Sequence, residues 1–154
     1  MNEFETLKNR YLNLYPLDGV QERDLKEIEK ILDIKLPNDF CEIAKFYGGG
    51  QIGDISIYSF NIEDEDNILE RTNQLRNAIS LPNDFIALAE PDEGIVVMDT
   101  KKEPRILWID AIEIDNLITG RFEVKPNTWK TYKDFFVELL EQEEMDKSND
   151  ICKQ

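Results

Sequence analysis

Residues 28–50, "IEKILDIKLPNDFCEIAKFYGGG", decide the fold, because a helix pattern, a proline junction, a second helix pattern and a glycine run follow one another there. Around the start of this stretch, apolar residues recur at helical spacing while charged residues fill the other face. These apolar residues are Leu25, Ile28, Ile31 and Leu32. The pattern predicts an amphipathic helix that ends at "DIKLP".

Pro37 marks the junction between two predicted helices. A proline disfavours the helical conformation of the residue before it, so the first helix should end by Leu36. Its ring suits the first position of a new helix, because the missing N–H has no intrahelical partner there. An apolar stripe then follows, formed by Phe40, Ile43, Ala44 and Tyr47. We expect the glycines at 48–50 to end this helix, since glycine accepts the left-handed conformation of a helix cap.

The word "LPNDF" occurs at residues 36–40 and again at 81–85. The second copy runs into "IALAE" and then "PDEG", which leaves too few residues for a helix and predicts a strand. One copy therefore opens a helix and the other a strand, so we do not interpret them as an internal repeat.

Outward from this stretch, residues 1–19 predict an N-terminal helix with Phe4, Leu7, Tyr11 and Leu14 on its apolar side. "DISIYSF" at 54–60 favours a strand. Residues 61–80 return to helical spacing, and we expect their acidic run to fill the first turn, where the helix dipole favours negative charge.

Three strands are predicted at 85–90, 95–99 and 105–110, joined by short turns into a meander. The stretch 111–126 is ambiguous and favours one more strand near 121–124. A final helix begins at Thr131, whose spacing to Asp134 is typical of a capping box. Its apolar face is Tyr132, Phe135, Phe136, Leu139 and Leu140. Residues 141–154 lose this face, and we expect them to fray.

The order of these elements predicts a single α+β domain over residues 1–154. Strands that are clustered in sequence and joined by short turns pair antiparallel, and the helices pack on one face of the sheet and at its ends. We expect an N-terminal helix at 1–19, a core at 20–140 and an acidic tail at 141–154.

The chain is strongly acidic, with 33 Asp and Glu against 18 Lys and Arg and a net charge of -15. Such a charge repels nucleic acid and anionic membrane, so we expect neither as a partner. It favours a basic protein partner, although solubility alone explains it equally well.

The sequence contains no histidine and two cysteines, Cys41 and Cys152. Catalytic triads and imidazole zinc sites are therefore excluded. We expect neither a signal peptide nor a membrane span, and the cysteines are too few to suggest a disulfide framework. These features predict a cytoplasmic protein without a cofactor.

Three local patterns are candidates for function. The glycines at 48–50 trail a helix, whereas a phosphate-binding loop leads into one, so helix termination is favoured. The carboxylates at 63–66 lack the glycine of a calcium loop, which leaves a helix start or a docking site for a basic partner. Trp108 lies in an apolar strand and is expected in the core, while Trp129 lies in a polar loop and is the better candidate for an exposed anchor. No local pattern pairs two carboxylates for hydrolysis, so we do not expect an enzyme.

Residues 28–50 resemble the signature of the SUKH superfamily, the Smi/Knr-type domain. The resemblance rests on a helix with Glu29, the pair Leu36 and Pro37, Phe40 at the start of the next helix, and the glycine run Gly48, Gly49 and Gly50. Farther on, "FIALAE", "GIVVMD", "RILWID" and "TYKDFFVELL" resemble the meander and last helix of that family. The similarity spans about residues 20–140.

The resemblance implies an α+β fold without catalysis. Many bacterial members are immunity proteins that bind and neutralise toxins, often nucleases, and fungal relatives are hubs in cell-wall signalling. We therefore expect an immunity protein that binds a basic toxin; the alternatives are a regulatory adaptor with several weak partners and, third, a small hydrolase.

The resemblance assigns no binding residue, so the candidates come from charge and exposure. We expect partner contacts from Glu63, Asp64, Glu65, Asp66, Asp92, Glu93, Trp129 and the acidic end of the chain. The sequence does not identify the toxin or choose between a monomer and a dimer.

Overall fold

The computed structural model describes the backbone of residues 2–152 and the side chains of residues 2–148. Its α-helices are α1 (Glu3–Leu12), α2 (Glu22–Leu32), α3 (Asn38–Ala44), α4 (Ile68–Ile79) and α5 (Tyr132–Cys152), with a 3-10 helix η1 (Ala111–Leu117). Its strands are β1 (Gly50–Ile52), β2 (Ile55–Ile57), β3 (Phe85–Ala89), β4 (Gly94–Asp99), β5 (Ile106–Asp110) and β6 (Asn127–Trp129). The predicted α+β fold is confirmed.

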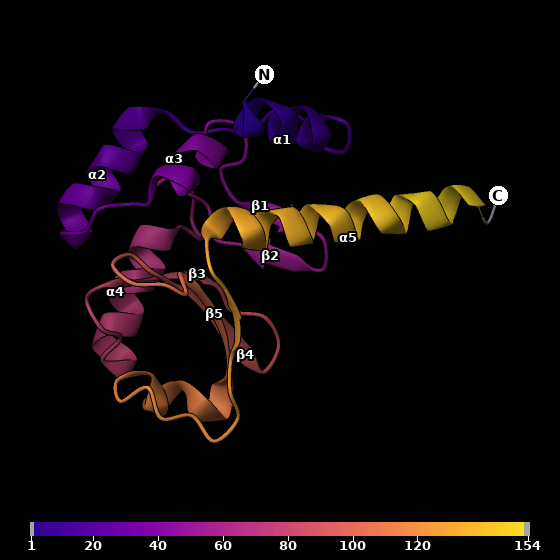
Figure 1. Cartoon of the computed structure of the whole chain (residues 1–154). Helices are drawn as coiled ribbons and strands as arrows, with labels where there is room; N and C mark the ends of the chain where they lie inside the picture. Colours follow the sequence, from indigo (N-terminus) through magenta and orange to yellow (C-terminus); the bar gives the residue numbers. More distant parts are fainter. Residues whose placement is uncertain (1, 153–154) are drawn as a thin grey trace.

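The strands form two antiparallel sheets, a hairpin of β1 and β2 and a four-stranded sheet in the order β3-β4-β5-β6. In Figure 1, α1, α2 and α3 gather at one end of the molecule, and α4 lies beside the four-stranded sheet. The long helix α5 runs alongside the β1–β2 hairpin and extends away from the sheet. The predicted meander is confirmed as β3, β4 and β5.

Both faces of the four-stranded sheet are covered. Along β4, Val96 and Met98 enter the main core, while Ile95 and Val97 enter a smaller cluster formed with η1 and the end of α4. Successive side chains of a strand point to opposite faces, so a strand covered on both sides is apolar at every position. This explains why "GIVVMD" shows no polar alternation.

An aromatic cluster joins the helices α1, α3 and α5. The ring of Tyr132 in α5 lies 4.7 Å from that of Phe40 in α3, and the ring of Phe136 lies 6.2 Å from that of Tyr11 in α1. All four side chains are buried. The first turns of α5 therefore complete the core that α1 and α3 begin.

Several predicted boundaries are wrong. The N-terminal helix expected over residues 1–19 ends at Leu12. Helix α4 begins only at Ile68, because Asn67 caps it by accepting a hydrogen bond from the backbone N–H of Glu70. The acidic run therefore lies outside the helix. Helix α3 ends at Ala44 and is capped by Lys45, so the glycine run does not cap it.

The strand expected near 121–124 does not form. The carboxylate of Glu113 accepts hydrogen bonds from the backbone N–H groups of Glu123 and Val124, which holds this segment as a loop. The fourth strand of the sheet is β6, farther along the chain. Residues 141–152, expected to fray, continue α5, and a 2.6 Å ion pair between Arg10 and Glu144 ties this part of the helix to α1.

Among the residues that the structure describes, no helix combines the length and the apolar character needed to cross a bilayer.

Candidate functional site

The glycine run forms a close crossing of three backbone segments. The N–H of Gly48 donates to the carbonyl of Asp18 at 2.6 Å, and the carbonyl of Gly48 accepts from the N–H of Phe60 at 2.8 Å. A Cβ on Gly48 would lie 2.8 Å from the Asp18 oxygen, and one on Gly49 would lie 2.6 Å from the Tyr58 oxygen. Glycine is therefore needed at 48 and 49, because residues 17–20 and 58–60 both approach the backbone there.

Residues 61–67, which we call the acidic loop, leave this crossing in an ordered conformation. The buried side-chain amide of Asn67 donates to the carbonyls of Ile62 and Asp64, the latter at 2.8 Å. The hydroxyl of Ser59 donates to the carboxylate of Asp64 at 2.6 Å. These bonds hold the backbone of the loop in place.

The four predicted contact residues of the acidic loop are Glu63, Asp64, Glu65 and Asp66, and all are exposed. The loop thus presents four carboxylates on an ordered backbone. Because folding has already ordered this backbone, a partner would not need to do so on binding.

Two residues that the sequence did not suggest lie beside this loop. The pKa of Asp18 is raised because neighbouring groups partly desolvate its carboxyl and because the charge of Asp64 repels its own. Asp24 lines a shallow depression of about 230 Å³ together with Glu63 and the basic Arg23. We call Asp18, Asp24 and residues 63–66 the acidic face. The backbone crossing brings these segments together although they are distant in sequence. No local sequence pattern therefore predicts the acidic face.

The other predicted contacts lie elsewhere. Asp92 and Glu93 are exposed in the turn between β3 and β4, and Glu93 adopts a left-handed conformation with φ 59°. The carbonyl of Glu93 accepts from the N–H of Ala111 at 2.9 Å, which places this turn beside the start of η1.

Trp129 lies in β6 and not in a loop, so the local structure expected for it is wrong. It pairs with Ile106, and its side chain is partly buried. The indole Nε1 donates to Glu138 at 2.9 Å, and the ring lies edge-on to Phe135 with centroids 4.8 Å apart. Its orientation is therefore fixed from α5.

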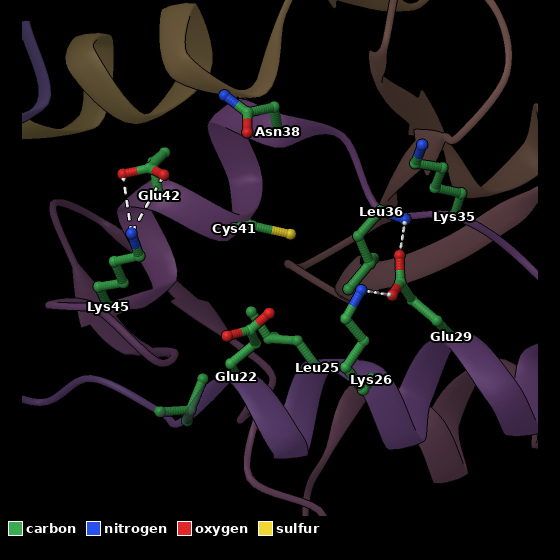
Figure 2. Close-up of a pocket in the computed structure, with 11 residues that line it drawn as sticks. Glu22, Leu25, Lys26, Glu29, Lys35, Leu36, Asn38, Cys41, Glu42 and Lys45 are labelled. Atoms are coloured by element: carbon green, nitrogen blue, oxygen red, sulfur yellow. Dashed lines mark hydrogen bonds and ion pairs between the residues drawn. The ribbon is translucent and has the colours of Figure 1, made fainter.

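A pocket of about 400 Å³ lies between α2 and α3. Figure 2 shows the sulfur of Cys41 pointing into the space between these helices. Glu29 at its edge accepts from the backbone N–H of Leu36 at 2.8 Å and lies 3.6 Å from Lys26. Burial raises the pKa of the Cys41 thiol to about 11, so the thiol stays protonated near neutral pH and is a poor nucleophile.

Within the part of the chain that the structure describes, no three Cys, Asp or Glu side chains gather as a metal site. The carboxylates of the acidic face are spread out, an arrangement that suits contact with a broad surface.

A family model described as SMI1-KNR4 cell-wall, SUKH_5, matches residues 1–123. The chain belongs to the SUKH family. The match covers the glycine crossing, the acidic face and the meander of this SUKH protein, and it ends before β6 and α5. The comparison with curated proteins returned no match.

Proposed function

We propose that this SUKH protein is a non-enzymatic binding domain that neutralises a basic toxin by covering its active site or substrate groove. The observation that carries the proposal is the acidic face, which two distant segments build on an ordered backbone. The family supports it, since many bacterial relatives are immunity proteins.

Charge gives the physical argument. A nuclease groove is positive because it binds phosphate, so a surface that carries several exposed carboxylates is complementary to it. The net charge of -15 adds long-range attraction and raises the rate of encounter with a basic partner. An immunity protein benefits from both, because it must bind its toxin before the toxin acts.

A regulatory adaptor is the second candidate. It is favoured by the family description, which names cell-wall proteins of the SMI1-KNR4 type. An adaptor would bind several partners weakly, whereas an immunity protein would bind one partner tightly.

Capture of the tagged protein from its own cells at moderate salt tests the proposal. We expect one basic, toxin-like protein to be retained, and its toxicity to be suppressed when the two are expressed together. A spread of weakly held partners would instead favour the adaptor.

A matched pair of variants tests the acidic face. The first changes Glu63, Glu65 and Asp66 to lysine and spares Asp64, because its carboxylate accepts the bond from Ser59. The control changes Glu27, Asp115 and Glu123 to lysine, three exposed carboxylates outside the acidic face. The two triple variants change the net charge by the same amount. We expect only the first to lose the partner; equal retention would remove the acidic face from the interface.

A further inference from the structure

A second pocket lies where the β1–β2 turn, the strands β5 and β6, and α5 meet. Its volume is about 280 Å³. Its walls include two indole rings, Trp108 and Trp129, and two carboxylates, Asp54 and Glu138. We call these four residues the aromatic pocket. It is separate from the acidic face, since the lining residues of the two do not overlap.

The two indole rings are held by the fold. Trp129 is fixed by its bond to Glu138 and by the ring of Phe135. Trp108 lies over Gly94, where an added Cβ would come within 3.0 Å of the indole Nε1. The missing side chain at Gly94 therefore allows the Trp108 ring to lie against the sheet. Both tryptophans remain partly exposed.

The charge of the pocket has one sign. Asp54 and Glu138 are exposed acids, and no lysine or arginine is among the residues that line it. Its remaining walls are apolar or neutral, formed by Ile55, Asn127, Phe135, Leu139 and Gln142. A cation entering here would meet aromatic rings and carboxylates and no lysine or arginine among the lining residues.

We propose that the aromatic pocket receives an arginine side chain of the basic protein partner. A guanidinium stacks on indole faces, and its planar fork of donors matches a carboxylate. The volume lies below the roughly 300–1,000 Å³ that is usual for small-molecule sites, which suits a single side chain. The inference rests on the proposed function, and it adds an anchoring contact away from the acidic face.

Nuclear magnetic resonance of the full chain tests this directly. The sequence has two tryptophans, so the indole N–H signals are assigned by Trp108→Phe and Trp129→Phe. The probe is N-acetyl-arginine methylamide, and the matched neutral probe is the citrulline analogue. We expect saturable shifts of both indole signals with arginine, with a millimolar dissociation constant, and much smaller shifts with citrulline.

A charge variant sharpens the test. Asp54→Asn combined with Glu138→Gln should weaken arginine binding by about fivefold or more, because both carboxylates are neutralised. The control, Glu27→Gln with Asp115→Asn, makes the same change in net charge away from the pocket and should bind as the parent does. Equal shifts from citrulline, stronger binding of N-acetyl-leucine methylamide, or no response to arginine would each overturn the proposal.

These outcomes are independent of the toxin. A chain that captures a basic toxin but shows no indole response keeps its proposed function and loses the arginine pocket. A chain that binds the arginine probe but retains no basic partner keeps the pocket and loses the immunity function.

Discussion

The carboxylate of Glu29 accepts a hydrogen bond from the backbone N–H of Leu36 at 2.8 Å. This contact spans the turn between α2 and α3, where Asp33 adopts a left-handed conformation with φ 55°. Glu29 thus holds the turn that orients α3. It gives a physical reason why a charged residue stands on this face of α2.

Glu29→Ala should lower the free energy of unfolding by about 1–3 kcal/mol, because it leaves a partly buried N–H without its charged acceptor. Glu27→Ala on the exposed side of the same helix is the matched control and should have little effect. Urea denaturation of both variants checks this. Equal midpoints would show that the bond to Leu36 contributes nothing.

Gly49→Ala and Gly50→Ala separate backbone strain from close packing. Both glycines have similar positive φ angles, 105° and 101°, so alanine is strained at either position. An added Cβ at Gly49 would lie 2.6 Å from the Tyr58 oxygen, whereas one at Gly50 would have nothing within 4 Å. We expect Gly49→Ala to be the more destabilising by roughly 1–3 kcal/mol. Thermal unfolding of the two variants measures the difference, and a reversed order would contradict the crossing.

Glu113→Gln should destabilise the protein in a pH-dependent way. The buried carboxylate accepts hydrogen bonds from the side chain of Asn116 and from the backbone N–H groups of Val124 and Glu123. These bonds lower its pKa, and the bond from Asn116 contributes most. Because the pKa of Glu113 is lower in the folded than in the unfolded protein, its ionised form stabilises the fold. This stabilisation is fully present above the unfolded pKa of about 4.3 and is lost as the pH falls through the folded pKa.

The melting temperatures of the parent and Glu113→Gln should therefore differ most near pH 7 and converge below about pH 4. Asp115→Asn, an exposed neighbour with the same charge change, is the control and should leave no such gap. A gap for Glu113→Gln that stays constant from pH 7 to pH 3 would show that its ionised form has no special role.

Asn67→Ala tests whether the order of the acidic loop matters apart from its charge. The variant removes the cap of α4 and the two bonds to loop carbonyls without changing any charge, at a cost of about 1–3 kcal/mol. We expect faster amide exchange in residues 62–66 and weaker partner binding. Asn73→Ala, on the exposed side of α4, is the control. Unchanged exchange would mean that Asn67 does not hold the loop.

A chain cut to the family match, residues 1–123, should not fold. It lacks the buried side chains of Tyr132, Phe135, Phe136 and Leu140. Each is worth about 1.5–3 kcal/mol on burial, so their sum rivals the roughly 5–15 kcal/mol of a whole domain. A chain cut after residue 146 keeps them and should fold. Circular dichroism of the two distinguishes these outcomes.

The sequence predicted those elements whose pattern is local. The strands β3, β4 and β5 and the start of α5 follow from short apolar runs and their turns. The errors at 61–67 and 121–124 share one cause, since Asn67 and Glu113 bind backbone groups several residues away and override the local preference. Such bonds become visible only once the chain is folded.

The candidate surfaces were less predictable than the elements. The exposure of Glu63 and Glu65 followed from their charge, but the neighbouring position of Asp18 depends on the crossing at Gly48. Likewise, Trp129 was a candidate anchor from its flanking residues. Its neighbour Glu138 lies only nine residues farther along the chain, in α5. Asp54, by contrast, comes from a turn far from it in sequence, which no spacing rule connects.

The packing of α5 on the first helices has a consequence for synthesis. The backbone N–H of Lys133 donates to Asp39 across a separation of 94 residues, and the amino group of Lys133 reaches Glu3 at 2.5 Å. At about 5–20 residues per second, a ribosome needs roughly 5–20 seconds to add that stretch. During this interval the apolar faces of α1 and α3 stay uncovered, because α5, which packs on them, has not yet been translated. We therefore expect the nascent chain to close its core late and to depend on chaperones while it waits.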